Sequence, residues 1–385
     1  MRKSVTDFGA VGNGIADDYG AFQKALDSGA KEIYVPQGVY CISETLKIKS
    51  DTHIIAEKTA KIVMKSKIRR MRNQFLLSNS DTENGNKNIA ITGGIWDGNN
   101  QAPENAKPDL FDKNGYSGAL LNFVNVDGLT LCDMVIANSV TYYVRMSRLR
   151  NFEITDISLV SDKFGVNQDG LHFGGDVKHG VVKNLRALSR GQTNDDMIAL
   201  NADDSIERVE NLDLVRDSIE DITFENIYTD NCHTIIRMLS VTAKIKNIRF
   251  KNIYGGFRCN AINADGARYC RTPLFNDEEH PEGVGEISDI YIENFVCFPV
   301  FDLPGDFGGT RVTPSEALRM EVSVDNFKIS GFRYETERSC ECPALRVKNV
   351  TNQKIIVDTA EYILKEKDEE LVVNSFENFE GEKNV

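Results

Sequence analysis

The chain has 385 residues and a formal net charge of −13, with 41% hydrophobic and 27% charged residues. This composition is typical of a folded soluble protein and excludes a chain that is disordered over most of its length. No apolar stretch is long enough to span a bilayer, and the acidic balance excludes a broad nucleic-acid surface, which needs a field of Lys and Arg.

The N-terminal residues 1–7 lack the apolar run of a signal peptide, and the eight cysteines form no Cys-x-x-Cys pair. We therefore expect reduced, mostly buried thiols and a cytoplasmic protein, although a secreted protein whose signal was removed would have the same sequence. The five histidines show no zinc-site spacing. The cysteines stand at Cys41, Cys132, Cys232, Cys259, Cys270, Cys297, Cys340 and Cys342.

The first forty residues predict a cap. Residues 18–28 favour one helix, with Phe22 and Leu26 on its apolar face and Asp17 or Asp18 as N-cap. Residues 31–40 then predict the first strands, around the turn at 36–38. A helix is the expected cover for the open end of a stacked-coil protein.

From the first third onward one pattern recurs: alternating apolar residues, then Asn, Asp or Gly, then another apolar residue. Period-two alternation predicts strands. The steps between the closing residues are 23, 28, 42, 26, 42 and 37, so a basal repeat in the twenties carries insertions. We predict an all-β, right-handed parallel β-helix with stacked Asn residues at its bends. The closing residues are Asp133, Asp156, Asn184, Asn226, Asn252, Asn294 and Gly331.

This repeat makes the chain a single domain of about ten to twelve coils, with residues 1–40 as cap and first strands, 41–350 as coils and 351–385 as a last coil or tail. The polar insertions are expected to gather on one face and wall a binding groove. They span residues 99–117, 202–218, 265–285 and 302–315.

Closely spaced carboxylates occur in two segments, Asn167-Gln-Asp169 and Asp195-Asp196. Asp169 and Asp195 are 26 residues apart, about one coil, so we expect them to stack on one outer face. Neighbouring like charges raise one pKa, which provides an acid beside bases, as glycoside hydrolysis requires. The alternative is that these residues make only local turn hydrogen bonds.

These segments resemble the Asn-x-Asp-Gly and Asp-Asp motifs of glycoside hydrolase family 28, the polygalacturonases and their relatives. Further segments support the resemblance over roughly residues 4–255, and the N-terminal one is typical of the wider pectin-lyase-like β-helix superfamily. They are Gly93-Gly-Ile-Trp-Asp-Gly-Asn99, Asn138-Ser139 before Tyr142-Tyr143-Val144, and Val5 to Gly14 with Asp17-Asp18.

The resemblance implies an inverting glycosidase that acts on a plant or microbial glycan without a cofactor or metal. It implies that Asp195 is the general acid and that Asp169 and Asp196 position and deprotonate water. Asn167 would orient the substrate or Asp169. The carboxyl separation expected for an inverting enzyme is about 6.5–9.5 Å.

The chain departs from the family after the Asp-Asp motif, where Gly-His-Gly and Arg-x-Lys would follow. His233 and Arg237 are only four residues apart, and Leu239 stands where Lys would be. We expect His233 and Arg237 to bind substrate, or else to cap a turn and pair with a loop acid. His172 is expected to contact sugar hydroxyls. The absent lysine disfavours polygalacturonate and favours a less charged or shorter substrate that is cleaved near a chain end.

Two other functions fit the same pattern. Asp169, Asp195 and Asp196 could hold Ca²⁺ in a polysaccharide lyase or epimerase, since Ca²⁺ prefers oxygen ligands. A non-catalytic carbohydrate-binding β-helix is the second alternative, because a fold does not define an activity. In all three the partner is a carbohydrate, with no nucleic acid or membrane, and the oligomeric state is open.

Overall fold

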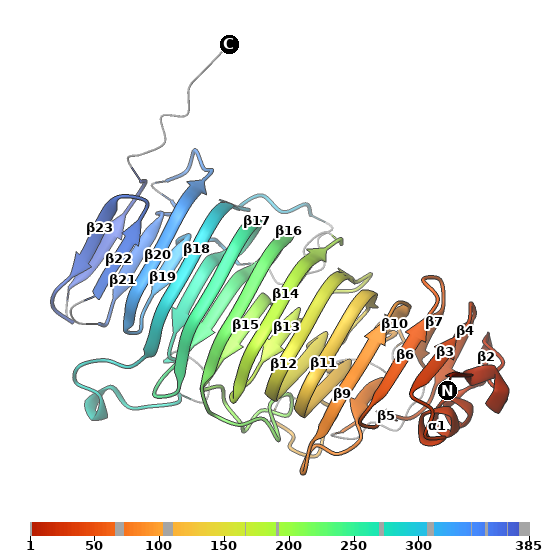
Figure 1. The fold of residues 1–385 in the computed structure, drawn as a ribbon. Helices are drawn as coiled ribbons and strands as arrows, with labels where there is room; N and C mark the ends of the chain where they lie inside the picture. The colour runs from red at the N-terminus through yellow and green to blue at the C-terminus, as the bar shows by residue number, and fades with distance from the viewer. Residues whose placement is uncertain are drawn as a thin grey trace.

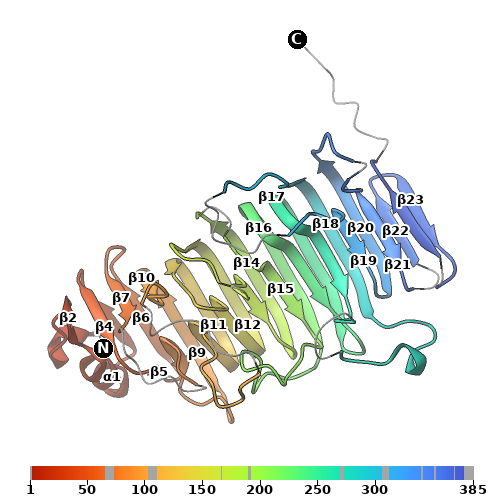
Figure 2. The same ribbon diagram turned by 180° about the vertical axis from the view of Figure 1, so that it is seen from behind.

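The computed structural model describes residues 2–65, 73–102, 111–165, 167–189, 192–268, 273–305, 312–339, 341–350, 353–367 and 369–376. These residues wind into a right-handed parallel β-helix, which confirms the predicted fold. The coils stack from α1 at one end to β21–β24 at the other (Figure 1). Figure 2 shows the same succession from behind.

The strands of the first half are short before the coils become regular. They are β1 (Arg2–Ser4), β2 (Asn13–Asp17), β3 (Glu32–Val35), β4 (Val39–Ile42), β5 (Leu46–Ile48), β6 (Thr52–Ala56), β7 (Lys61–Met64), β8 (Leu77–Asn79), β9 (Asn86–Thr92), β10 (Ile95–Asp97), β11 (Leu121–Ala137) and β12 (Val144–Val160).

The second half contains the longest strands and the short strands that carry the carboxylate motifs. They are β13 (Leu171–Phe173), β14 (Val177–Ala187), β15 (Asp196–Asn201), β16 (Ile219–Leu239), β17 (Lys244–Asp265), β18 (Glu286–Pro299), β19 (Leu318–Met320), β20 (Val324–Tyr334), β21 (Leu345–Lys348), β22 (Gln353–Val357), β23 (Ala360–Leu364) and β24 (Glu370–Val373).

The N-terminal cap contains the predicted helix, α1 (Tyr19–Asp27), whose Phe22 and Leu26 are buried in the core. Its N-cap is Asp18, but this side chain caps no helical N–H. It accepts instead from the backbone N–H groups of Val11 at 2.6 Å and Gly12 at 3.2 Å, which fixes the preceding loop. The first strands come earlier than predicted, because β1 and β2 precede the helix and pair with β3 and β4.

The core consists of aliphatic and aromatic side chains stacked in register on successive coils. Ile157 lies opposite Leu185, Leu185 opposite Ile227, and Ile227 opposite Ile253. All four are buried. Burial of such a side chain contributes about 1.5–3 kcal/mol, so each coil is stabilised mainly by the two coils that it contacts.

The predicted ladder of Asn residues is present at the bends. Asn226 donates through Nδ2 to Asn184 Oδ1 at 2.9 Å, and Asn252 donates to Asn226 at 2.9 Å. Asn184 in turn donates to Asp156 and Asn294 to Asn252. Each of these residues has a φ between 55° and 58°, the left-handed region that Asn and Asp tolerate best. The repeated Asn therefore forms the bend of its coil and links that coil to the next one by a hydrogen bond.

The described part of the C-terminal tail ends in strands that reverse direction. β22 continues the parallel stack on β20, whereas β23 runs antiparallel to β22 and β24 antiparallel to β21. Antiparallel strands cover the last open sheet edges, which would otherwise offer unpaired backbone groups.

The described cysteines carry free thiols, and Cys232 and Cys297 are among those fully buried. Cys270 and Cys340 lie outside the described residues, as do 103–110, 269–272 and 306–311 of the predicted insertions. Among the described helices, none is both long and apolar enough to cross a membrane.

Candidate functional site

The two carboxylate segments lie side by side on neighbouring coils. Gly170 N donates to Asp196 O at 2.9 Å, and Leu171 of β13 lies opposite Ile198 of β15. Asp169 therefore neighbours Asp196 and not Asp195, so the expected stacking was wrong by one residue. Residues that lie opposite each other on these two coils are 27 apart in the sequence, whereas Asp169 and Asp195 are 26 apart. The strand register, and not the spacing between the motifs, determines which side chains meet.

The three carboxylates also differ in accessibility. Asp169 and Asp196 are only 3% and 2% exposed, whereas the Asp195 side chain is 26% exposed. The expectation of one shared outer face is therefore wrong for two of them. Of the three, Asp195 alone presents an appreciable surface to a ligand.

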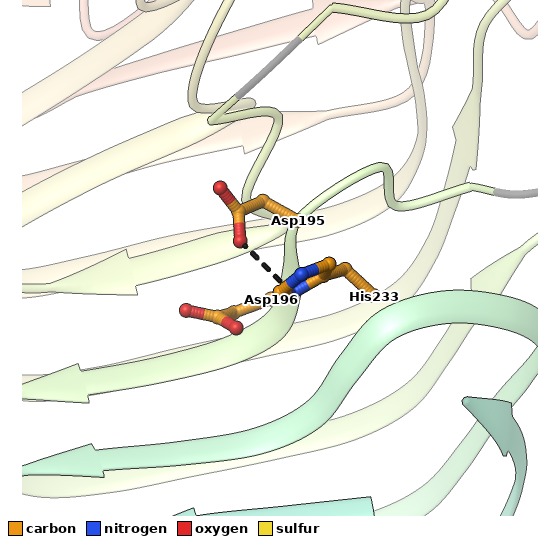
Figure 3. Close-up of side chains that lie close together, drawn as sticks. All are labelled: Asp195, Asp196 and His233. Carbon is orange, nitrogen blue, oxygen red and sulfur yellow. Dashed lines mark ion pairs between the residues drawn. The ribbon is translucent and has the colours of Figure 1, made fainter. Parts of the chain in front are cut away.

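Asp195 is held from two sides. His233 Nδ1 lies 3.4 Å from Asp195 Oδ1 (Figure 3), and the backbone N–H of Asn167 donates to Asp195 Oδ2 at 3.1 Å. His233 reaches this position because β16 is irregular between Thr229 and Thr234, where it pairs with β17 out of register. Burial lowers the pKa of His233, and the neighbouring Asp195 opposes that shift. Asn167 thus positions Asp195, whereas we expected it to orient Asp169 or the substrate.

His172 lies entirely inside the protein, which contradicts the expected contact with sugar hydroxyls. Its exposed fraction is 0%, and its ring stacks on Tyr142 with centroids 3.9 Å apart. Nδ1 lies 2.7 Å from Asp169 Oδ2, and Nε2 lies 3.7 Å from Asp204 Oδ2. Burial lowers the pKa of His172 to about 3, so the neutral ring supports Asp169 from behind.

Arg237 is bound mainly to a buried acid. Its Nε and Nη2 donate to Asp265 at 3.0 and 3.3 Å, while Nη1 lies 3.8 Å from Asp196 Oδ2. This is the predicted alternative of pairing with an acid, although one of Arg237's nitrogens also faces the carboxylate cluster. Leu239 is fully buried opposite Asp265, so it provides no cation to the site.

Burial and repulsion change the protonation of two carboxyl groups. Burial raises the pKa of Asp169 and of Asp196 well above the ordinary value, and the charge of Asp195 raises both further. Arg237 opposes these shifts. The two residues to which the resemblance gives the role of base therefore retain protons to a higher pH than free aspartate does.

Asp195, Asp196 and His233 lie close together, since each offers one ligand atom within 4.8 Å of the others.

The same three residues form the one candidate metal cluster among the described residues. It contains two carboxylates and one imidazole, which differs from the three aspartates that we considered for Ca²⁺. Ca²⁺ takes six to eight oxygen ligands, and imidazole suits zinc and other transition ions better. This donor set therefore fits Ca²⁺ poorly.

Sequence reasoning missed the groups behind the carboxylates. Arg258 is fully buried and donates to Asn194 Oδ1 at 3.0 Å, directly before Asp195. Asp204 faces His172, and Tyr142 covers the ring of His172. No sequence signal set Arg258 apart, because strand β17 also carries exposed cations: Lys244, Lys246, Arg249 and Lys251.

Two of the segments that carried the resemblance have a structural contact with each other. Asn138 Nδ2 lies 3.2 and 3.1 Å from the two oxygens of Asp97, and both residues are buried. Lys61 neutralises Asp97 at 2.7 Å. These motifs therefore join coils and do not extend the carboxylate site.

Two of the polar insertions line a hollow. Those at 202–218 and 265–285 line a hollow of about 420 Å³ with Arg216, Phe275 and His280. Asp203, which also lines it, lies two residues beyond the last residue of β15. Since Asp196 begins β15, the hollow and the carboxylates lie at opposite ends of this strand.

Comparisons with known proteins agree on the fold and divide on activity. A family model described as rhamnogalacturonase A/epimerase, pectate lyase-like, matches residues 3–102. The pre-neck appendage protein of Bacillus phage phi29 is 36% identical over 98 residues, which are 26% of this chain and 11% of the phage protein. The chain thus spans a small part of that relative's length.

A probable polygalacturonase of Arabidopsis thaliana is 24% identical over 349 residues, 84% of this chain and 66% of the plant protein. The crystal structure of an N-terminal fragment of phage phi29 gene product 12 superposes with a TM-score of 0.68 at 16% identity. It covers 92% of this chain and 57% of that one.

The structural likeness shows the right-handed parallel β-helix fold, and the family match covers only the N-terminal residues 3–102. Proteins similar to parts of this chain include a probable polygalacturonase, mannuronan C5-epimerases and phage appendage proteins. The fold is thus one that carbohydrate-active proteins use.

Proposed function

We propose that the protein hydrolyses a glycosidic bond in a plant or microbial oligosaccharide or polysaccharide. The observation that carries the proposal is the cluster of Asp169, Asp195 and Asp196, in which one carboxylate is accessible and two are buried with raised pKa values. Unequal environments for neighbouring carboxyl groups are what separates an acid from a base in glycosidases. The similarity to a probable polygalacturonase over most of the chain supports the same chemistry.

In the proposed reaction Asp195, the most exposed of the three carboxyl groups, takes up the proton that burial favours on Asp169 and donates it to the leaving oxygen. Asp169 is thereby left ionised and removes a proton from water, and Asp196 holds that water between the two. His233 and the backbone of Asn167 position Asp195, and His172 positions Asp169. Water attack from the face opposite the leaving group inverts the anomeric carbon.

The substrate proposed is not polygalacturonate. Recognition of a uronate at the cleavage point needs a free cation, and the cations near the carboxylates are engaged: Arg237 binds Asp265, and Arg258 binds Asn194. A neutral sugar at the cleavage point, near the end of a short chain, fits this site better.

One observation favours a second function, glycan binding without cleavage. Asp169 and Asp196 are almost completely buried, so catalysis requires that water or substrate gains access to them. The phage appendage relative is also similar to this chain in its N-terminal coils. A β-helix that only binds glycans would retain the fold without needing that access.

A panel of plant and bacterial oligosaccharides, with the product anomer followed by NMR, tests the proposal. We expect hydrolysis of at least one neutral or mixed glycan, with the inverted anomer formed first. A retained anomer would overturn the inverting mechanism and point to Asp196 as a nucleophile close to Asp195. Unsaturated products that absorb in the ultraviolet would indicate a lyase, and binding without turnover would indicate the second function.

A further inference from the structure

Asp195, Asp196 and His233 gather where β15 begins, with the two aspartates beside the imidazole ring (Figure 3). In the proposed reaction His233 only positions Asp195. Two carboxylates and one imidazole are also the ligand types that bind zinc and related transition ions. Whether this cluster can bind such an ion depends on its available ligand atoms, on their spacing and on their access to solvent.

Asp196 provides the first observation, because its buried carboxylate lacks hydrogen-bond donors. The side chain is 3% exposed, and within the described part of the chain it accepts no hydrogen bond. Nη1 of Arg237 lies 3.8 Å away, beyond hydrogen-bond distance, and Nε and Nη2 of this arginine donate to Asp265. Buried polar groups nearly always have a partner, so a bound ion would account for a buried carboxylate without a donor.

The spacing of the other two ligand atoms fits a small divalent ion. In a tetrahedral zinc site the ligand atoms lie about 2.0–2.1 Å from the ion, which places them roughly 3.3–3.4 Å from one another. Asp195 Oδ1 and His233 Nδ1 are 3.4 Å apart. The Asp196 oxygen lies within 4.8 Å of both ligand atoms, so a side-chain movement of roughly 1 Å gives it the same spacing.

Two of the three ligands are accessible from solvent and are already oriented. The Asp195 and His233 side chains are 26% and 22% exposed, so an ion can enter beside them and reach the buried Asp196. The backbone N–H of Asn167 donates to Asp195 Oδ2, which leaves Oδ1 facing the imidazole. Thr234 Oγ1 lies 3.2 Å from His233 Nδ1, but its hydroxyl hydrogen can rotate away and leave this nitrogen to an ion.

We propose that Asp195, Asp196 and His233 bind a divalent transition ion of the zinc type, and that this ion inhibits the proposed hydrolysis. The ion and a proton compete for the Asp195 carboxylate, so Asp195 cannot donate to the leaving oxygen while the ion is bound. The metal-free protein is therefore the active form. Binding rests on the geometry of the cluster, whereas inhibition also rests on the proposed function.

Titration calorimetry with Zn²⁺ on the metal-free protein tests binding without any glycan. We expect one Zn²⁺ site per chain that His233→Asn weakens about 100-fold or more, because loss of a ligand should cost at least as much as loss of a group that only orients one. Asp196→Asn should weaken the same site in the same direction. On a glycan that the protein hydrolyses, saturating Zn²⁺ should abolish turnover, and EDTA should restore it.

His179→Asn is the matched control, because His179 Nδ1 also lies 3.4 Å from a carboxylate oxygen, that of Asp221, but belongs to no three-ligand cluster. Unchanged Zn²⁺ affinity in both His233→Asn and Asp196→Asn, each shown to be folded by circular dichroism, would overturn the site, as would an equal loss in His179→Asn. Turnover that persists when Zn²⁺ saturates the site would overturn the inhibition. Zn²⁺ binding that depends on His233 in a protein that hydrolyses no glycan would support the site and contradict only the hydrolase.

Discussion

Two series of Asn and Asp residues run along successive coils of this β-helix, and they behave in opposite ways. At the bends, Asp156, Asn184, Asn226 and Asn252 link in sequence by amide-to-oxygen hydrogen bonds at the protein surface. At the carboxylate cluster, three acids, Asp169, Asp195 and Asp196, lie close together, and Asp169 and Asp196 are buried. An amide placed between coils satisfies its neighbour, whereas a carboxylate beside a carboxylate repels it.

Asn and Asp residues therefore stabilise the fold at the bends, whereas at the cluster the Asp residues form the candidate site. The bend series contributes stability, because every member gains a partner. The cluster lowers the free energy of unfolding, because buried carboxylates repel each other unless they bind protons. Such a cost is typical of functional sites, so each series predicts a different response to substitution.

The largest expected effect is on turnover. Asp195→Asn removes the proposed proton donor while preserving its shape, so we expect kcat on a responsive glycan to fall about 10²–10⁴-fold. Asp156→Asn is the matched control in the bend series, because Asn retains an oxygen that can accept from Asn184 and tolerates the positive φ. Steady-state kinetics would compare the two. Equal turnover in both variants would remove the catalytic role.

The next effect is on stability. Asn226→Ala loses the hydrogen bonds with Asn184 and Asn252 and places a Cβ-bearing, non-polar residue at a φ of 58°. We expect the free energy of unfolding to fall by about 2–4 kcal/mol, of which about 1–2 arises from the backbone. Urea denaturation would measure it. Asn226→Gly restores the backbone freedom, so it should lose less, and an equal loss would show that the ladder bonds alone matter.

A smaller effect, opposite in sign, is expected from Asp196→Asn. Burial raises the pKa of Asp196 in the folded protein. At a pH below the ordinary aspartate pKa the side chain is protonated in both the folded and the unfolded state, so its ionisation does not reduce stability. The free energy of unfolding then falls as the pH rises through the raised pKa. Asn cannot ionise, so the variant should be more stable than the wild type at pH 7 by about 1–3 kcal/mol and show no gain at acidic pH.

Urea unfolding at both pH values checks the sign for Asp196→Asn. The exposed Asp156→Asn should show no such pH-dependent gain. A variant destabilised at neutral pH would mean that the Asp196 carboxylate is satisfied in the folded state, contrary to the contrast drawn above.

The smallest expected effect is that of a chelator. The proposed hydrolysis uses no metal, so EDTA should leave turnover unchanged. Asp195, Asp196 and His233 could nevertheless hold an ion. If EDTA abolishes turnover and Ca²⁺ restores it with unsaturated products, the lyase reading replaces the hydrolase reading.

The fold could be predicted because its signals are local and repeated. Apolar alternation, followed by Asn at a bend, recurs on each coil, and Asn226 or Asn252 shows both the backbone conformation and the hydrogen bond that the pattern implies. The helix over 19–27 was predicted for the same reason. The early strands β1 and β2 were missed because they are short, and their partners lie beyond the helix.

The sequence motifs predicted that the carboxylates are close together but not how they are arranged. One residue of register places Asp169 beside Asp196 and not beside Asp195. The contact of His172 with sugar hydroxyls was wrong because this side chain is completely buried. The supporting Asp204 and Arg258 belong to other coils, and no spacing in the sequence links them to the carboxylates.

The sequence by itself determined that this chain forms a stack of coils, where the coils bend and which two segments carry closely spaced acids. Those properties depend on local periodicity and on residues that prefer left-handed backbone. Only the tertiary structure decided which carboxylates are buried and which one His233 reaches through an irregular strand. These depend on register and burial, which arise when distant coils pack against each other.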